Sequence, residues 1–361
     1  MSYHQDLEKT TRDMHDACLE VEYMKKLPIL NLILEKKNKK FKGGKRYYWE
    51  IDTDTTEDTA QNYGAQDTLT HQNSDTLDDV YFRRKQFQVP VTIDLDEELQ
   101  NAMETEDRTQ LHKLAKHKVK KCNEAGRLHL RKQLYASPNA GTGIFGTDTN
   151  KNMQGLNSAL QLDATNITTY GEKTRSDTCD STYKFWQPAN DIYTKVNQET
   201  ETNISIEWLQ SVYDPIGDLE TTSSDKLIIV GNALYMALRS EAQARSMPVD
   251  YDPAGNFKYG IEEMVIDGMR IVKEPFFQTR YNTIMGETTG SAHDLSRRLY
   301  ILNMNDWYFY IHPKRNFFMT TFFDQSQIAN GVDFTLARLK VAGNIICRHP
   351  NRQAYFANII P

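Results

Sequence analysis

Long apolar runs and paired cysteines are both missing from this chain of 361 residues. No stretch approaches the roughly 20 apolar residues of a membrane-spanning helix, and the opening Met1–Asp6 lacks the apolar core of a secretory signal. We therefore expect a soluble protein that is made in the cytoplasm and has no membrane partner. The 4 cysteines lie far apart without a C-x-x-C pair, which argues against a disulfide scaffold and a zinc site.

The sequence motifs of catalysis are also missing: the chain has no G-x-S-x-G, H-E-x-x-H or P-loop lysine motif. Gly141–Gly146 matches G-x-G-x-x-G, but it follows an expected long helix, whereas a dinucleotide site needs a strand before it. His112 and His117 are spaced so that they do not share one helical face. We expect no cofactor, no metal and no catalytic residue, although carboxylates assembled by the fold would leave no signature.

Hydrophobic residues are scarce at 39%, but 19 Tyr and 15 Phe supply material for a core and exclude wholesale disorder. The net charge of −6 argues against a protein that coats nucleic acid over its whole surface. The distribution of charge is more informative than its sum, because basic and acidic residues are concentrated in separate segments.

One segment predicts a long β-hairpin. Lys36–Arg46 contains seven Lys or Arg in eleven residues, and an alternating strand covers Arg46–Asp52. A second strand-like run covers Val80–Ile93, and residues 52–79 between the strands carry eight acids and no Lys or Arg. Because so polar a stretch cannot bury a core, we expect the hairpin to project from the body.

A long basic helix should follow the hairpin. Acidic residues in Asp94–Glu98 favour a helix start, and we expect the helix to reach about Ala136, with a break near Thr105 as an alternative. One face is apolar, and the remainder is basic, with nine Lys or Arg against Glu124 alone between residues 108 and 132. Further on, the patterns predict these elements: a helix over 205–212, a buried strand over 227–231, a helix from an Asn232 cap to about Arg245, and strands over 298–302, 307–311, 316–319 and 337–342.

This order of parts resembles the major capsid proteins of tailed bacteriophages, which share the fold named after the Hong Kong 97 coat protein. The resemblance covers nearly the whole chain and includes Asn152–Asn157, which is similar to the family's return to the peripheral domain. It implies an α+β chain divided as follows: an N-terminal arm over 1–42, an extended loop over 43–92, a peripheral domain over 93–204 and 300–361 with a spine helix over 94–136, and an axial domain over 205–299.

The resemblance implies a structural subunit rather than an enzyme. Pentamers and hexamers of the chain would form the icosahedral shell of the virion, assembled in the host cytoplasm, with a portal protein, a possible decoration protein and packaged double-stranded DNA. About 40 residues precede the hairpin, too few for a fused scaffold, so a separate scaffolding protein is expected. No lysine lies between Lys45 and Lys85, so the hairpin tip is not expected to form covalent crosslinks.

Two sets of charged residues are candidate sites. The hairpin acids have no cation within the hairpin, and we expect them to meet basic surface on an adjacent subunit, such as the run from Lys36 or the pair Lys314–Arg315. This intersubunit set is Asp67, Asp75, Asp78 and Asp79 with Lys36, Lys37, Lys39, Lys40 and Lys42. The helix face would line the lumen and contact DNA through Lys113, Lys116, Lys120, Lys121, Arg127 and Arg131. Alternatively these cations are merely solvated or pair with acids of neighbouring subunits.

Three other functions remain as alternatives. An encapsulin-type nanocompartment shell would hold a cargo peptide in a groove and contain no DNA. A nucleic-acid-processing enzyme would use the basic helix and act as a metal-dependent monomer. A phage tail or adhesin component would lack the long basic helix after the hairpin.

Overall fold

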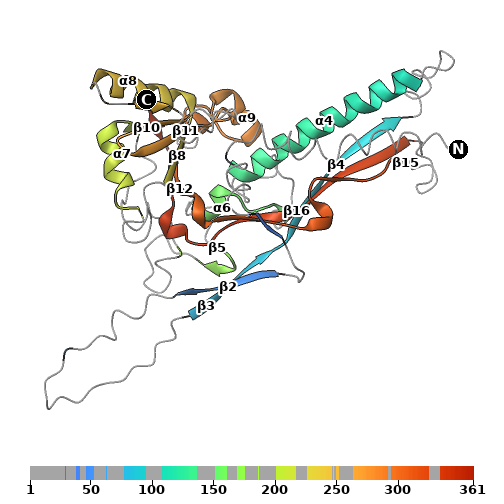
Figure 1. Cartoon of the computed structure of the whole chain (residues 1–361), viewed down its shortest axis with the longest axis horizontal. Helices are drawn as coiled ribbons and strands as arrows, with labels where there is room; N and C mark the ends of the chain where they lie inside the picture. The colour runs from blue at the N-terminus through green and yellow to red at the C-terminus, as the bar shows by residue number, and fades with distance from the viewer. Residues whose placement is uncertain are drawn as a thin grey trace.

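The computed structural model describes part of the chain in detail. The described residues are 29, 38–40, 46–52, 62, 77–94, 108–135, 151–160, 169–174, 186, 201–216, 226–245, 247, 249–251, 263–291, 294–324 and 334–361. These residues form an elongated blade, a more compact unit at one end of it and a hairpin below both (Figure 1).

The blade is a sheet covered by one helix. Its longest strands are β4 (Lys85–Asp94) and β16 (Phe334–Cys347), which pair antiparallel over ten residues of β4. The far end of β16 pairs with β13 (Trp307–Ile311). Three short strands complete the sheet: β1 (Asn38–Lys40), β14 (Phe318–Met319) and β15 (Phe323–Asp324).

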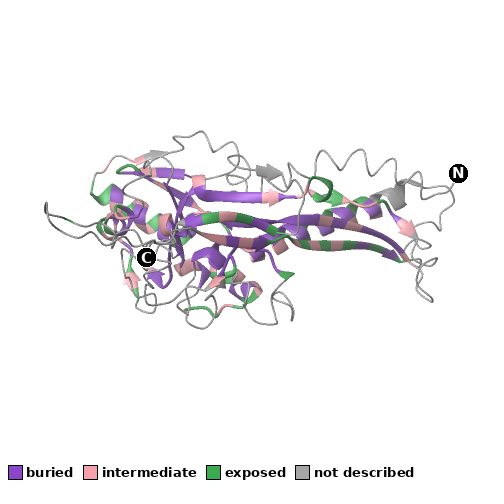
Figure 2. Ribbon diagram, turned by 90° about the horizontal axis from the view of Figure 1, so that it is seen from below, coloured by how far each residue is buried: buried purple, intermediate pink, exposed green. Residues whose placement is uncertain are grey.

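Helix α4 (Arg108–Tyr135) lies along β4. Because side chains alternate along a strand, one face of β4 can pack on the helix while the other meets solvent. Figure 2 shows this alternation as bands of buried and exposed residues along the long strands. Val91 is buried at 3% exposure, and the ring of Phe87 lies 4.9 Å from that of His129 in α4. Burial, with Lys132 nearby, lowers the pKa of His129, so this contact favours a neutral imidazole.

The compact unit is a second six-stranded sheet with helices packed on it. Its strands are, in spatial order, β17 (Ala354–Phe356), β12 (Leu299–Asn303), β8 (Lys226–Val230), β11 (Met269–Lys273), β10 (Glu263–Ile266) and β9 (Val249–Tyr251). Every residue of the two central strands β8 and β12 is buried. Helices α7 (Ile206–Tyr213) and α8 (Asn232–Ala244) contribute apolar side chains to the same core.

Short strands and helices complete the described structure. Near the compact unit, β7 (Thr202–Asn203) and β18 (Ile359–Ile360) pair in parallel. The short helices are α6 (Leu156–Leu160), η7 (Thr279–Tyr281), α9 (Asn282–Met285), η8 (Leu295–Arg297), η9 (Met304–Asp306), η10 (Pro313–Arg315) and η11 (Pro350–Arg352).

The spine helix does not begin where its acids predicted. Asp94 is the last residue of β4 and pairs with Phe334 of β16, so a helix start at Asp94 is wrong. The strand continues to this point because β16 supplies hydrogen-bonding partners and Ile93 is buried. Residues 95–107 and the glycine-rich motif lie outside the described residues, whereas the predicted end of the helix near Ala136 agrees with Tyr135.

The hairpin and the domain boundaries also differ from the prediction. The run Val80–Ile93 is two strands in different sheets, because β3 (Leu77–Arg83) pairs with β2 (Arg46–Asp52) while β4 pairs with β16. Assigning residues 300–303 and 354–356 to the peripheral domain disagrees with the sheets, since β12 pairs with β8 and with β17. The cap of α8 is Gly231 without a side-chain bond, so the predicted Asn232 cap is wrong.

We predict that Gly155→Ala strongly destabilises the subunit. A Cβ atom at this position would lie 2.1 Å from the carbonyl oxygen of Gln133 and 2.5 Å from that of Leu134, at the end of α4. Because backbone atoms cannot move aside cheaply, we expect a loss of about 3 kcal/mol or more in the free energy of unfolding. The measurement is urea or thermal unfolding of the purified subunit.

Gly268→Ala is the matched control, because its Cβ would meet no atom within 4 Å and only the positive φ of +77° opposes it. That strain costs about 1–2 kcal/mol. Equal losses for the two variants would contradict the close packing of Gly155 on α4.

Candidate assembly surfaces

The hairpin has a buried inner face and an exposed outer face. Strands β2 and β3 pair in antiparallel register from Arg46 opposite Arg83 to Asp52 opposite Leu77. Along β2, Tyr47 is buried at 8% exposure, whereas its neighbour Tyr48 is 70% exposed. The alternation predicted from the sequence therefore separates one face that packs on the body from one that does not.

Aromatic side chains attach the inner face to the blade. The ring of Tyr47 lies 4.5 Å from that of Tyr310 in β13, and within the hairpin the indole of Trp49 stacks on Phe82, with ring centroids 5.0 Å apart. The guanidinium of Arg348 lies 5.7 Å from the Trp49 ring. Each such contact adds about 0.5–1.5 kcal/mol beyond area burial, so the root of the hairpin is held against the body.

A turn braces the hairpin from the side. Gly171 and Glu172 join β5 (Thr169–Tyr170) to β6 (Lys173–Thr174). The Gly171 carbonyl accepts the amide N–H of Tyr81 at 3.0 Å. Gly171 has a φ of +64°, and a Cβ there would lie 2.0 Å from Val80, so the position requires glycine.

Ion pairs reinforce this brace. The carboxylate of Glu172 reaches both Arg46 and Arg83 at 3.2 Å, and the next residue, Lys173, lies 2.5 Å from Asp78. We expected Asp78 to meet basic surface on an adjacent subunit, but its ion pair with Lys173 lies within the same subunit. Lys173 was missed because 95 positions of sequence separate it from Asp78.

The other members of the predicted intersubunit set are placed in part. Asp79 lies in β3 and accepts the hydroxyl of Tyr81 at 3.0 Å. The exposed Lys314 and Arg315 lie in η10, and Arg315 donates to Gln86. Lys39 and Lys40 belong to β1, and the structure describes their backbone alone. The residues outside the described ones are Asp67, Asp75, Lys36, Lys37 and Lys42.

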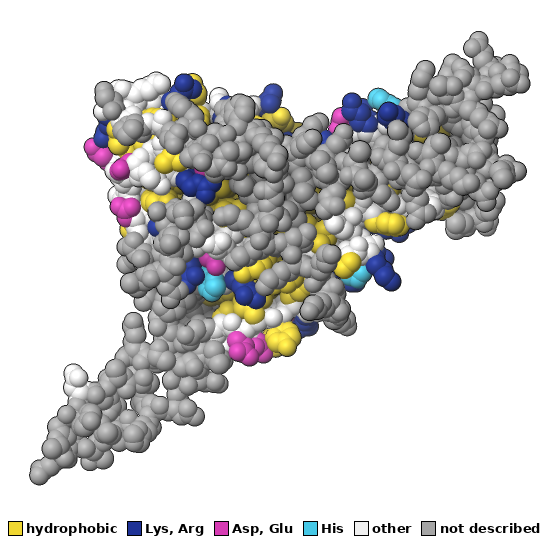
Figure 3. Space-filling view, viewed as in Figure 1, with side chains coloured by type: hydrophobic (Ala, Val, Ile, Leu, Met, Phe, Trp, Pro, Cys, Tyr) yellow, Lys and Arg dark blue, Asp and Glu magenta, His cyan; other side chains and the backbone are white. Residues whose placement is uncertain are grey.

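The predicted basic face of α4 is shorter than expected. Lys116, Lys120 and Lys121 are exposed, and Lys121 lies 3.5 Å from Glu124. Lys and Arg side chains gather over α4 in the space-filling view (Figure 3). The side chain of Lys113 is outside the described ones.

Arg127 does not belong to this exposed face, so the prediction is wrong for Arg127, whereas Arg131 is half-buried. Arg127 is 7% exposed, and the guanidinium of Arg131 lies 5.4 Å from the ring of Phe276. The physical reason is that the last turns of α4 pack against the segment after β11 instead of facing solvent.

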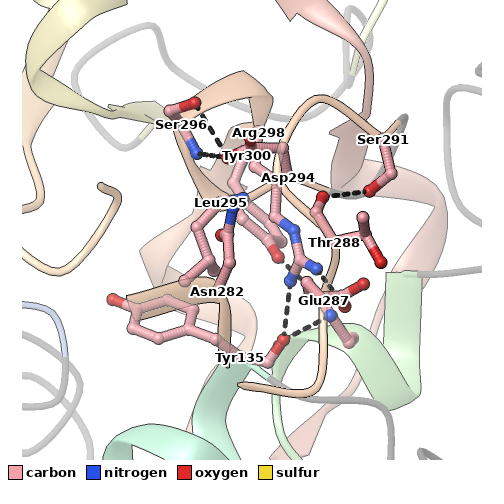
Figure 4. A network of polar contacts seen from close by, with 11 residues as sticks. Tyr135, Asn282, Glu287, Thr288, Ser291, Asp294, Leu295, Ser296, Arg298 and Tyr300 are labelled. Carbon is pink, nitrogen blue, oxygen red and sulfur yellow. Dashed lines mark hydrogen bonds and ion pairs between the residues drawn. The ribbon is translucent and has the colours of Figure 1, made fainter. Parts of the chain in front are cut away.

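The end of α4 meets the compact unit through a buried polar network, which we call the joint (Figure 4). Arg298 has no exposed surface, donates to the carbonyl oxygen of Tyr135 at 3.0 Å and pairs with Glu287 at 2.5 Å. Asn157 of α6 also donates to the Tyr135 carbonyl and accepts the hydroxyl of Tyr300 at 2.5 Å. The end of α4, helix α6 and the segment at Arg298 therefore meet at one carbonyl group.

The loop that carries Glu287 is itself fixed by hydrogen bonds. Asp294 accepts the amides of Gly290 at 2.8 Å and Ser296 at 2.9 Å, and Asn282 accepts the amide of Leu295 at 3.0 Å. Although burial alone would raise the pKa of Asp294, these hydrogen bonds hold it below its ordinary value. The charged form of this carboxylate therefore stabilises the loop.

Glu274 adds a buried carboxyl group to the joint. It accepts the hydroxyl of Tyr135 at 2.9 Å and the amide of Phe276 at 3.1 Å. Burial raises the pKa of Glu274, against the smaller opposing effect of Arg131. Burial and the neighbouring Glu274 also raise the pKa of Tyr135, so the phenol keeps its proton and acts as the donor.

Sequence reasoning missed the joint. Its members lie far apart in the chain, and the one local signal is a charged Arg298 directly before a strand of apolar residues.

Among the described residues, no group of three or more His, Cys, Asp or Glu side chains is arranged to hold a metal ion. No described helix is long and apolar enough to span a membrane.

Comparison with known proteins shows the fold. No protein-family model and no curated protein sequence matches the chain. The chain is similar to the capsid subunit of cyanophage A-1(L), with a TM-score of 0.56 and 12% identity over 92% of this chain and 93% of that one. It is also similar to the SrpI encapsulin of Synechococcus elongatus PCC 7942, with a TM-score of 0.50 and 7% identity over 93% and 89%. The predicted α+β, Hong Kong 97-like capsid fold is therefore confirmed.

The joint predicts a specific pH dependence. Because the pKa of Glu274 is higher in the folded chain than its ordinary 4.5, the folded state binds more protons. The contribution of this site to stability is therefore greatest below about pH 4.5 and is lost as the pH rises through the raised pKa. We expect Glu274→Gln to gain stability relative to wild type as the pH rises, measured by melting temperature from about pH 4 to pH 8.

Glu124→Gln, at an exposed position of α4, is the control for removing one acid. A difference between wild type and Glu274→Gln that stays constant across this pH range would contradict a raised pKa at the joint.

Proposed function

We propose that this chain is the structural subunit of a self-assembling icosahedral shell, the major capsid protein of a tailed phage, and that it is not an enzyme. The observation that carries the proposal is the capsid-type fold over more than nine-tenths of the chain. The shell would enclose the phage genome in the virion and assemble in the host cytoplasm from pentamers and hexamers.

The geometry of the subunit supports a lattice-forming role. A two-stranded hairpin is marginally stable alone in water, yet this one is fixed at its root by aromatic packing and by the Glu172 brace while its outer face stays exposed. Exposed ion pairs are worth roughly 0.2–1 kcal/mol each. Weak contacts of this kind suffice for a shell, because every subunit repeats them with several neighbours.

The finer assignments belong to the same proposal. Residues 1–42 act as an arm and the hairpin of β2 and β3 as the extended loop, and the blade and the compact unit serve as peripheral and axial domains. A separate scaffolding protein, a portal protein and a possible decoration protein are the expected partners. Lys39, Lys40, Lys314 and Arg315 are candidates to meet the hairpin acids of an adjacent subunit.

The exposed lysines of α4 would face the lumen. Lys116 and Lys120 lie one turn apart on α4, and Lys121 is exposed next to them farther around the helix. Phosphate neutralisation of this kind is independent of DNA sequence, which suits a wall that packaged double-stranded DNA touches.

A nanocompartment shell is the second candidate, favoured by the similarity to an encapsulin at a TM-score of 0.50. Both candidates predict particles, and they differ in what the particles contain. Packaged DNA supports the phage shell, whereas a protein cargo held by a peptide supports the nanocompartment.

We expect the expressed chain to form closed particles or tubes, with a scaffolding protein from the same genome added if needed. The reason is that the hairpin leaves a surface which a single subunit does not cover. Negative-stain electron microscopy of purified material is the measurement. A well-behaved monomer at high concentration, with the scaffold present, would overturn the proposed function.

The lumen assignment makes a separate prediction for unassembled subunits. Lys116→Gln, Lys120→Gln and Lys121→Gln together should weaken binding to duplex DNA and flatten its salt dependence. Each lost phosphate contact lowers the log–log slope by roughly 0.9, so we expect a decrease of about 2 to 3. Lys314→Gln with Arg315→Gln is the control at another exposed basic site, and the same slope for both variants would contradict the assignment.

A further inference from the structure

The outer face of the hairpin carries three cross-strand pairs, which we call the outer-face ladder. One pair is basic, one is aromatic and one is acidic, spaced roughly 7 Å apart because alternate residues share a face. From the root toward the tip, the pairs are Arg46–Arg83, Tyr48–Tyr81 and Glu50–Asp79.

The charged pairs are unfavourable within one subunit, because like charges directly opposite each other on a sheet repel. Glu172 lies between Arg46 and Arg83 at 3.2 Å from each and relieves the basic pair. In the described part of the chain, no ion pair reaches Glu50 or Asp79. The acidic end of the ladder therefore lacks the compensation that the basic end has.

The aromatic pair between them is open to solvent. Tyr48 is 70% exposed, more than Met236 at 49% or Phe318 at 39%, the other exposed large hydrophobic side chains among the described residues. Its ring lies 6.5 Å from that of Tyr81. Along the edge of the body where β2 lies, basic, hydrophobic and acidic side chains follow one another in the space-filling view (Figure 3). Exposed aromatic area flanked by charges is typical of a contact surface.

We infer that the outer-face ladders of two copies of this chain dock on each other around a two-fold axis through their tyrosines. A rotation of 180° places the arginines of each copy over the acids of the other, so both charged ends are matched at once. Such a contact is isologous, because each copy uses the same patch. Sheet faces pack about 10 Å apart, which leaves room for the tyrosine rings and the paired charges.

This inference rests on the proposed function for its place in a shell, although the contact itself needs only two copies. It differs from docking of the hairpin on another surface, because the complementary charges lie on the same face. That self-complementarity gives a test in which two defective variants restore each other.

The first variant, Glu50→Lys with Asp79→Lys, makes both ends of the ladder basic. The second, Arg46→Glu with Arg83→Glu and Glu172→Lys, makes both ends acidic and keeps opposite charges between the hairpin root and residue 172. Analytical ultracentrifugation of unassembled subunits measures dimer formation. We expect each variant alone to dimerise at least tenfold more weakly than wild type and an equimolar mixture to recover wild-type affinity.

Circular dichroism and melting temperature establish that each variant is folded before it is compared. A mixture of folded variants that associates no better than either alone would overturn the inference, and so would undiminished association of each variant by itself.

A crosslinking experiment uses the wild-type charges and does not depend on those variants. Tyr48→Cys is introduced together with Cys18→Ser and Cys179→Ser, and a short bismaleimide crosslinker, whose span suits sheet faces about 10 Å apart, should give a species of twice the chain mass on a denaturing gel. Ser240→Cys, at an exposed position of α8, is the matched control. If Tyr48→Cys forms no more dimer than Ser240→Cys, in subunits and in particles, the two-fold contact is wrong.

Microscopy of the same samples tests the two-fold contact separately from the proposed shell function. Particles of the Tyr48→Cys variant that the bismaleimide does not crosslink would overturn this contact and leave the proposed function standing. A crosslinked dimer that never forms particles would support the contact and count against the shell.

Discussion

The guanidinium of Arg298 lies where water does not reach, so protein groups have to match its charge and its N–H donors. The carbonyl of Tyr135 and the carboxylate of Glu287 do so, and they come from the end of α4 and from a loop of the compact unit. Removing one member of a buried pair costs about 3–5 kcal/mol. This requirement fixes where α4 ends relative to the second sheet, and the direction of the whole blade follows from it.

The hairpin shows the opposite situation, in which charge is left incompletely matched at the surface. Its root is compensated within the subunit by Glu172, and Asp78, near the other end of the described strands, is compensated by Lys173. Farther along, Glu50 and Asp79 face each other across the strands without a cation from the described residues. Among the described residues, charge is therefore matched at the joint and left unmatched at the Glu50–Asp79 pair, which is the distribution expected when one region sets shape and another makes contacts.

Local features of the sequence predicted local structure well. The alternation in Arg46–Asp52 and the polar stretch after it predicted the hairpin, because strand periodicity is a short-range property. The division of Val80–Ile93 between two sheets was not visible, since the alternation continues through Arg84 and pairing partners are set by distant strands. Asp94 had the composition of a helix start, but the ladder with β16 extends the strand to that residue.

The exposed cations of α4 could be predicted only where the helical period alone decides whether a side chain faces solvent. Lys116, Lys120 and Lys121 are exposed as expected, whereas Arg127 is covered by parts of the fold that no local pattern reports. The partner of Asp78 and the members of the joint are brought together by tertiary structure. The resemblance in the order of elements, more than any single residue, led to the correct fold.

The path of the chain between the two sheets bears on how the subunit is made. Strand β12 is sandwiched between β8 and β17, and β7 pairs with β18, so the compact unit is completed by residues 354–360, long after its first strands are synthesised. Until these residues leave the ribosome, the outer edge of β12 has no partner, and an unpaired edge invites wrong pairing with other chains. The compact unit can therefore close its sheet only after residues 354–356 have been synthesised, so its folding is completed late in translation.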